Sequence, residues 1–195
     1  MTNIRLNSPL ALVPAAVAGM AIGAMFFSLF GGAWLAFGSV QAMGPRWGWV
    51  ALIASLSLAI LFAAVNQYRN NSPALAAESG TPAKKKQDRL FHIINAGQWV
   101  LIFIVGNVLN NLGRGDWFFA AAIIIVGAHF LPLGRLFRYP PHYATGAIMI
   151  LWGFGYPFLA KAGAASPVGC LGEGLLLWAS AVYALKAEPP VEEPA

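Results

Sequence analysis

A histidine lies inside one of the most apolar stretches of this chain. His129 follows residues 121–128, which are alanine, isoleucine, valine and glycine, and it precedes Phe130, Leu131 and Pro132. A titratable side chain in such a segment is costly to place in lipid, so it indicates a functional site by default. Because an imidazole changes charge near neutral pH, it can bind a solute or pass on a proton in a pH-dependent way.

The surroundings of His129 are typical of the whole chain. Of the 195 residues, 58% are hydrophobic and only 10% are charged, whereas soluble domains are ~25% charged. Six apolar stretches approach the ~20 residues that cross a bilayer. They predict an all-α polytopic membrane protein with a single transmembrane domain over residues 1–195. The six transmembrane helices form three hairpins and cover about residues 12–38, 47–68, 91–112, 117–137, 143–162 and 167–185.

Two segments fall outside these stretches. Residues 69–90 contain asparagine, serine, proline and a run of lysines, and this composition predicts a flexible cytoplasmic loop. Residues 187–195 form an acidic, proline-containing tail that we expect to be disordered. The first apolar stretch is long enough either to tilt or to contain a short re-entrant break at Gly31 and Gly32.

The positions of the cations predict the orientation. With the N-terminus inside, nine of the twelve lysines and arginines fall on the cytoplasmic side. This bias places both termini in the cytoplasm. The formal charge of +5 is explained by these cations, so we expect the lipid bilayer as a partner and no nucleic acid. Cys170 is the single cysteine, which excludes an intramolecular disulfide.

Polar residues accompany His129 on the preceding stretch. His92, Asn95 and Gln98 recur every three residues, and helical rise places Gln98 ~10 Å and His129 ~12 Å from the same cytoplasmic end. With Arg135 near the interface, these five residues predict an inward-facing polar pocket that binds a small polar ligand. The alternative is ordinary hydrogen bonding between helices, worth ~0.6 kcal/mol per contact.

A carboxylic acid lies in the last stretch. Glu173 falls ~9 Å from the outer face, and Tyr156 reaches a similar depth. The pair suggests a proton relay in which the Tyr156 hydroxyl donates a hydrogen bond to Glu173. The alternative is a glutamate tucked between Gly172 and Gly174 and bonded to backbone or a hydroxyl.

Several chemistries find no support in the sequence. There is no nucleophile–base set, phosphate-binding loop, metalloprotease motif or dinucleotide fingerprint. The three histidines, His92, His129 and His142, fall at different predicted depths, which disfavours haem and zinc. We therefore assign no catalytic residue, no metal and no cofactor, and an enzyme is not favoured.

Glycines predict close approach of helices. Gly19 and Gly23 lie one turn apart in the first stretch, and the last two stretches contain Gly153, Gly155, Gly169, Gly172 and Gly174. Such residues let helix backbones pack closely, either within the chain or against another subunit.

One segment resembles a motif of known proteins. The sequence from His129 to Arg135, His-Phe-Leu-Pro-Leu-Gly-Arg, followed by Tyr143-Ala144-Thr145-Gly146, resembles a family of small uncharacterised bacterial integral membrane proteins. The resemblance covers the third to fifth stretches. It implies a six-span, multi-pass protein of the bacterial inner membrane and carries no activity with it.

These observations leave three classes of function. The first is a small-solute transporter or ligand-binding membrane protein with the inward-facing polar pocket. The second is a structural or accessory membrane subunit that binds a membrane partner, or a second copy of itself, through glycine-rich helix faces. An intramembrane enzyme comes third.

The orientation can be tested by thiol labelling. In a Cys170→Ala background, a cysteine placed within residues 72–80 should react with a membrane-impermeant maleimide from the cytoplasmic side only. A Gly113→Cys variant should react from the opposite side only, because the cation bias places the two segments on different sides. Reaction of either cysteine from the other side would overturn the orientation.

Overall fold

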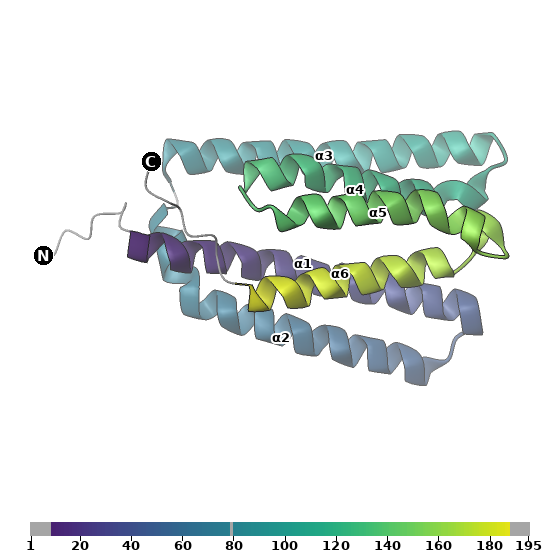
Figure 1. Cartoon of the computed structure of the whole chain (residues 1–195), viewed down its shortest axis with the longest axis horizontal. Coiled ribbons are helices and arrows are strands. Elements are labelled where there is room, and N and C mark those ends of the chain that lie inside the picture. The colour runs from purple at the N-terminus through teal and green to yellow at the C-terminus, as the bar shows by residue number, and fades with distance from the viewer. Residues whose placement is uncertain (1–8, 79, 188–195) are drawn as a thin grey trace, which may run out of the picture.

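The computed structural model describes residues 9–78 and 80–187. It confirms an all-α fold with six helices (Figure 1). The helices are α1 (Pro9–Met43), α2 (Trp47–Glu78), α3 (Pro82–Asn111), α4 (Phe118–Leu136), α5 (Pro141–Leu159) and α6 (Val168–Lys186). Two short 3-10 turns, η1 (Gly115–Trp117) and η2 (Gly163–Ala165), precede α4 and α6.

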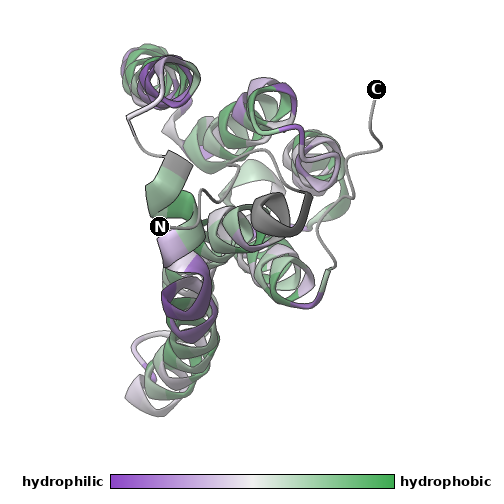
Figure 2. Cartoon of the chain, turned by 90° about the vertical axis from the view of Figure 1, so that its left-hand side faces the viewer, coloured by the Kyte–Doolittle hydropathy of each residue, from purple (hydrophilic) through white to green (hydrophobic). Residues whose placement is uncertain are grey.

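The helices have the length and surface of membrane-spanning segments. Five of them, all except α5, are long and apolar enough to cross a membrane. The sixth helix, α5, is as long as α6, with 19 residues, but its apolar sequence also contains glycine, proline and tyrosine. Apolar residues occur all around the helices when the bundle is viewed along its axis (Figure 2). Phe62 and Phe158, for example, are 76% and 79% exposed, which suits a surface facing lipid rather than water.

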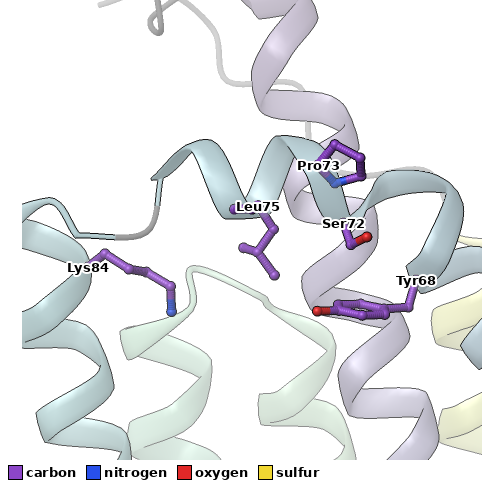
Figure 3. A pocket seen from close by; sticks show the side chains of 6 residues that line it. Tyr68, Ser72, Pro73, Leu75 and Lys84 are labelled. Atoms are coloured by element: carbon purple, nitrogen blue, oxygen red, sulfur yellow. The ribbon is translucent and has the colours of Figure 1, made fainter.

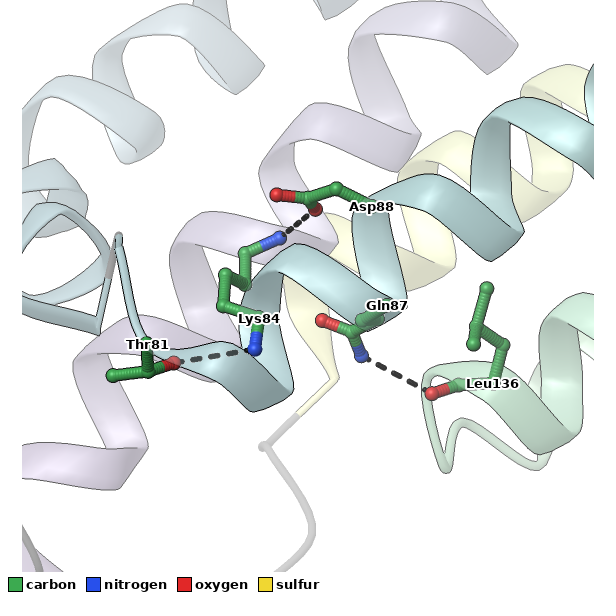
Figure 4. A network of polar contacts seen from close by, with 5 residues as sticks. All are labelled: Thr81, Lys84, Gln87, Asp88 and Leu136. Atoms are coloured by element: carbon green, nitrogen blue, oxygen red, sulfur yellow. Dashed lines mark hydrogen bonds and ion pairs between the residues drawn. The ribbon is translucent and has the colours of Figure 1, made fainter.

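The segment predicted as a flexible loop is almost entirely helical. α2 continues to Glu78, and α3 begins at Pro82. The hydroxyl of Thr81 accepts a hydrogen bond from the backbone nitrogen of Lys84 at 3.2 Å, and Lys84 pairs with Asp88 one turn later (Figure 4). Such an N-terminal cap followed by proline is a strong local signal for a helix start, and it outweighs the polar composition. Residues 188–195 of the predicted tail lie outside the described residues.

α1 is one continuous helix, so the re-entrant break at Gly31 and Gly32 was wrong. These two glycines are contact points instead. A Cβ added to Gly31 would lie 2.6 Å from the ring of Trp178, and one added to Gly32 would overlap Ser57. α1 therefore passes between α6 and α2, and it packs closely against both.

The helices form two groups of three. α1 packs along α2 and α6, and we call these three helices the first unit. α4 packs along α5 and α3, and these form the second unit. Contacts between the units are sparse and involve mainly α5 and α6. Figure 1 shows the second unit lying above the first, so the predicted hairpin of α5 and α6 is divided between the two.

Glycines hold each unit together. Between α4 and α5, a Cβ on Gly146 would lie 2.5 Å from the carbonyl oxygen of Gly127. Between α6 and α1, a Cβ on Gly174 would lie 2.7 Å from the carbonyl oxygen of Gly31. Gly19 behaves differently, since a Cβ there would meet no atom within 4 Å. Close backbone approach thus occurs inside the units, which makes each of them compact.

The turns between helices gather at two opposite ends of the bundle. The hairpin end contains the α1–α2, α3–α4 and α5–α6 turns. The terminal end contains the start of α1, the end of α6, and the α2–α3 and α4–α5 turns (Figure 1). The sequence predicts that the terminal end faces the cytoplasm.

Candidate functional site

Buried polar atoms without a partner are the strongest sign of a site in this molecule. Among the described residues, such atoms belong to five side chains: Ser57, Gln98, Tyr139, His142 and Glu173. Leaving a buried donor or acceptor unpaired costs about 1–3 kcal/mol, so each case needs an explanation such as a bound ligand, water or ion.

Two of these atoms lie in a cluster of rings at the terminal end. His142, in the first turn of α5, lies near four aromatic rings: Tyr139 at 4.9 Å, Phe130 at 5.5 Å, Phe27 at 6.1 Å and Phe137 at 6.4 Å between centroids. We call these five residues the His142 cluster. Phe27 belongs to α1 and the other four to the α4–α5 region, so both units contribute to it.

The turn between α4 and α5 builds this cluster. Arg138 adopts a left-handed conformation with φ of 50°, and the backbone nitrogen of Tyr139 donates to the carbonyl of Gly134 at 3.0 Å. This arrangement ends α4 and reverses the chain. Pro140 then precedes α5, and Pro141 starts it, where a missing backbone donor costs nothing. The result folds Tyr139 and His142 back beside the end of α4.

Tyr139 is a neutral hydrogen-bonding group in this position. Burial raises the pKa of Tyr139 to about 12, and the nearby Tyr183 of α6 adds to the shift. Its hydroxyl therefore stays protonated throughout the neutral range, and it is able to donate a hydrogen bond. The oxygen has no partner within the described chain.

His129 lies beside the same cluster. Its side chain is half-buried, and its Nδ1 lies 3.0 Å from the carbonyl oxygen of Val126 on the same helix. Its ring is 4.6 Å from that of Phe130, which also neighbours His142.

The structure does not bring the five predicted pocket residues together. His92 is exposed on α3 with its ring beside Phe91, and Arg135 is exposed in the last turn of α4. Asn95 and Gln98 are half-buried on α3. Within the described residues, no hydrogen bond joins any two of the five. The predicted pocket is therefore wrong as a set.

Part of the predicted proximity does hold. Gln87 donates to the carbonyl of Leu136 at 3.1 Å (Figure 4), and a Cβ on Gly106 would lie 2.9 Å from the ring of Phe118. These two contacts fix the antiparallel register of α3 and α4. Counting residues from either contact places His129 level with Asn95 or its neighbour Ile94. Gln98, which the sequence placed at the depth of His129, therefore lies about one helical turn, or ~5 Å, further along α3.

The predicted hydrogen bond between Tyr156 and Glu173 is absent. The Tyr156 hydroxyl donates instead to the carbonyl of Ala164 in η2 at 3.0 Å. Both carboxyl oxygens of Glu173 are buried without a partner, so the alternative of a glutamate bonded to backbone or hydroxyl does not hold either. η2 brings the Ala164 carbonyl over the end of α5, and no feature of the sequence predicted this contact.

A separate pocket lies between the end of α2 and the start of α3 (Figure 3). Its volume is about 470 Å³, and it is lined by Tyr68, Ser72, Pro73, Leu75, Ala76 and Lys84. It contains none of the predicted residues and none of the unpartnered atoms. The Lys84 amine is already paired with Asp88. The groups between the two units are therefore the stronger candidate site.

Metal binding finds no support in this geometry. Within residues 9–78 and 80–187, no three side chains of histidine, cysteine, aspartate or glutamate come together around a common point.

Sequence reasoning missed the central role of Tyr139 and His142. The signal was the pair Pro140 and Pro141, because two prolines between a tyrosine and a histidine predict a tight turn followed by a new helix. That turn places the flanking ring side chains against the end of α4.

Comparison with known proteins adds nothing to this site. A scan against protein-family models and searches of the curated proteins and the solved structures found no match to the chain. The resemblance to small bacterial membrane proteins stays a prediction.

Two tyrosines with buried hydroxyls, Tyr139 and Tyr156, provide a matched test of the unpartnered groups. Tyr139→Phe should stabilise the protein by about 1 kcal/mol, because it removes a buried hydroxyl that has no hydrogen bond. Tyr156→Phe should destabilise it by a similar amount, because it leaves the Ala164 carbonyl unpaired. Thermal unfolding of the purified variants in one detergent measures both. Destabilisation by Tyr139→Phe would mean that its hydroxyl is satisfied and that the cluster is ordinary packing.

Proposed function

We propose that this protein binds a small polar solute between its two three-helix units and carries it across the bacterial inner membrane. The observation that supports this proposal is the His142 cluster. In it, Tyr139 and His142 present buried polar atoms without partners among rings from both units. The terminal end, where the cluster lies, faces the cytoplasm in this proposal, with the N- and C-termini on that side.

The division into two units supports a carrier. Solute sites in membrane carriers lie at the interface between helix groups that move against each other. Inside the units, helix backbones approach each other closely at glycines such as Gly127 and Gly146. Between the units, the contacts are made by large side chains and by isolated hydrogen bonds. Thr145 of α5 and Ser180 of α6 form one such bond at 3.0 Å. Such an interface can part without breaking either unit.

The chemistry of the cluster suggests the class of solute. The Tyr139 hydroxyl and the His142 Nδ1 offer hydrogen bonds, while the surrounding phenylalanine rings offer flat apolar contact. A neutral or cationic solute with a hydrogen-bonding group and an apolar face fits these features. Pro132 lies one turn from His129 in α4 and provides a place for that helix to bend as the site opens.

The accessory-subunit alternative has less support. Most of the glycines on which it depends, including Gly169, Gly172 and Gly174, are occupied by contacts inside the chain. Gly19 and Gly23 remain open on α1, and they would be the place for a partner helix.

A solute panel tests the proposal directly. The purified protein in lipid nanodiscs is screened by thermal unfolding against neutral amino acids, sugars, nucleobases and polyamines. We expect at least one of these classes to raise the unfolding temperature, since a ligand at a hundredfold excess over its Kd adds about 2.7 kcal/mol. His142→Phe should abolish this shift because it keeps the ring contacts and removes the nitrogen.

The control is Tyr143→Phe, which changes an exposed neighbouring ring and should leave the shift unchanged. The proposal fails if no class of solute stabilises the protein. It fails equally if His142→Phe responds to the stabilising solute as the unaltered protein does.

A further inference from the structure

Glu173 points into the interface between the two units. It lies in the second turn of α6 and is fully buried. On one side of it, Gly174 packs against the Gly31 carbonyl of α1, and on the other, Gly172 packs against the Trp152 ring of α5. Because successive helix positions are ~100° apart, the side chain between these two glycines faces the space between α1 and α5.

No group in the described chain is placed to neutralise a charge there. Both carboxyl oxygens lack a hydrogen-bond partner. The facing parts of α1 (residues 27–41), α2 (residues 47–65) and α4 (residues 118–128) contain no titratable side chain. The titratable neighbours are Cys170 on the preceding turn and Tyr156 on α5, whose hydroxyl is bonded to Ala164. A bare carboxylate in such an interior costs several kcal/mol, so the protonated acid is the form that this arrangement accepts.

The hairpin end closes off this carboxyl. The Trp152 indole donates to the carbonyl of Gly169 at 3.0 Å, and the Tyr156 hydroxyl donates to Ala164 at 3.0 Å. The ring of Tyr156 also lies directly over Gly169, where a Cβ would overlap it. Together these contacts join α5 to η2 and to the start of α6, just beyond Glu173.

Polar groups continue from Glu173 toward the terminal end. Ser180, two turns further along the same face of α6 and ~10 Å away by helical rise, is bonded to Thr145. The His142 cluster follows beyond them. The buried apolar side chains of Leu177 and Met149 lie between Glu173 and this pair. Leu177 is one turn after Glu173 on α6, and Met149 is one turn after Thr145 on α5. These two side chains form a dry barrier in the closed interface.

We propose that Glu173 is a proton-binding site that exchanges its proton with water at the terminal end when the two units part at Leu177 and Met149. Proton release then requires opening of the interface, because the ionised carboxyl needs water around it. Proton binding allows the interface to close again. This assignment depends on burial and position and does not require a solute at the His142 cluster.

Carbodiimide labelling of the full chain in nanodiscs tests the site. Dicyclohexylcarbodiimide reacts with a protonated carboxyl in an apolar surrounding. The acid proton moves to a carbodiimide nitrogen, the carboxyl oxygen bonds to the central carbon, and rearrangement leaves a stable N-acylurea. We expect peptide mass spectrometry to find the label on Glu173, with less label as the pH is raised. Exposed Asp116 should remain unlabelled, and Glu173→Gln should carry no label at that position.

The barrier is tested with a water-soluble carbodiimide. Leu177→Ala and Met149→Ala should each increase the rate of Glu173 labelling severalfold, because water and the reagent reach the acid more easily. The matched control, Leu151→Ala, removes a side chain that is 72% exposed on the outer face of α5 and should leave the rate unchanged. A Glu173 that stays unlabelled at every pH, or whose labelling does not change with pH, would overturn the proposal. Equal rates of Glu173 labelling in all three variants would contradict the proposed role of Leu177 and Met149 as a barrier.

Discussion

Close backbone contact at glycine is the constraint on which the rest of this structure depends. Gly31 and Gly174 bring α1 and α6 together, and Gly127 and Gly146 do the same for α4 and α5. In a membrane, where burying apolar side chains offers little advantage over lipid, such packing is a main source of helix association. The glycine contacts therefore decide that α6 packs in the first unit and α5 in the second, although the two are neighbours in sequence.

This division gives a reason for the positions of Tyr139, His142 and Glu173 among the unpartnered polar groups. Between the units there is room for the rings around His142 and for the carboxyl of Glu173. The units are joined by few contacts, among them the Thr145–Ser180 and Trp152–Gly169 hydrogen bonds and ring contacts between α1 and α4. The binding and protonation proposals depend on this same property.

The length and apolar composition of the stretches were sufficient to predict six helices, since a bilayer leaves few alternatives. They did not predict the polar extensions of α2 to Glu78 and of α3 from Pro82. Depth along the axis was predictable to about one helical turn, as the offset between His129 and Gln98 illustrates. Rotation about the axis was not. Steps of three residues fall ~60° short of a full turn, so two steps rotate His92 ~120° from Gln98 and move it out of the α3–α4 contact. Arg135 is likewise six residues from His129, so its side chain lies ~120° around α4 from that of His129. The unit division depends on contacts between distant glycines, which a single sequence does not specify.

Both proposals require that the two units move as rigid bodies about their shared interface. Distances between spin labels in nanodiscs test this most directly. In a Cys170→Ala background, labels at Ala144→Cys and Lys186→Cys measure a distance between α5 and α6, across the two units. Labels at Asn70→Cys and Lys186→Cys measure a distance between α2 and α6, within the first unit. Such a motion predicts two separated distance populations, with proportions that change with pH, for the first pair and one narrow population for the second. A single narrow population for both pairs at every pH would contradict it.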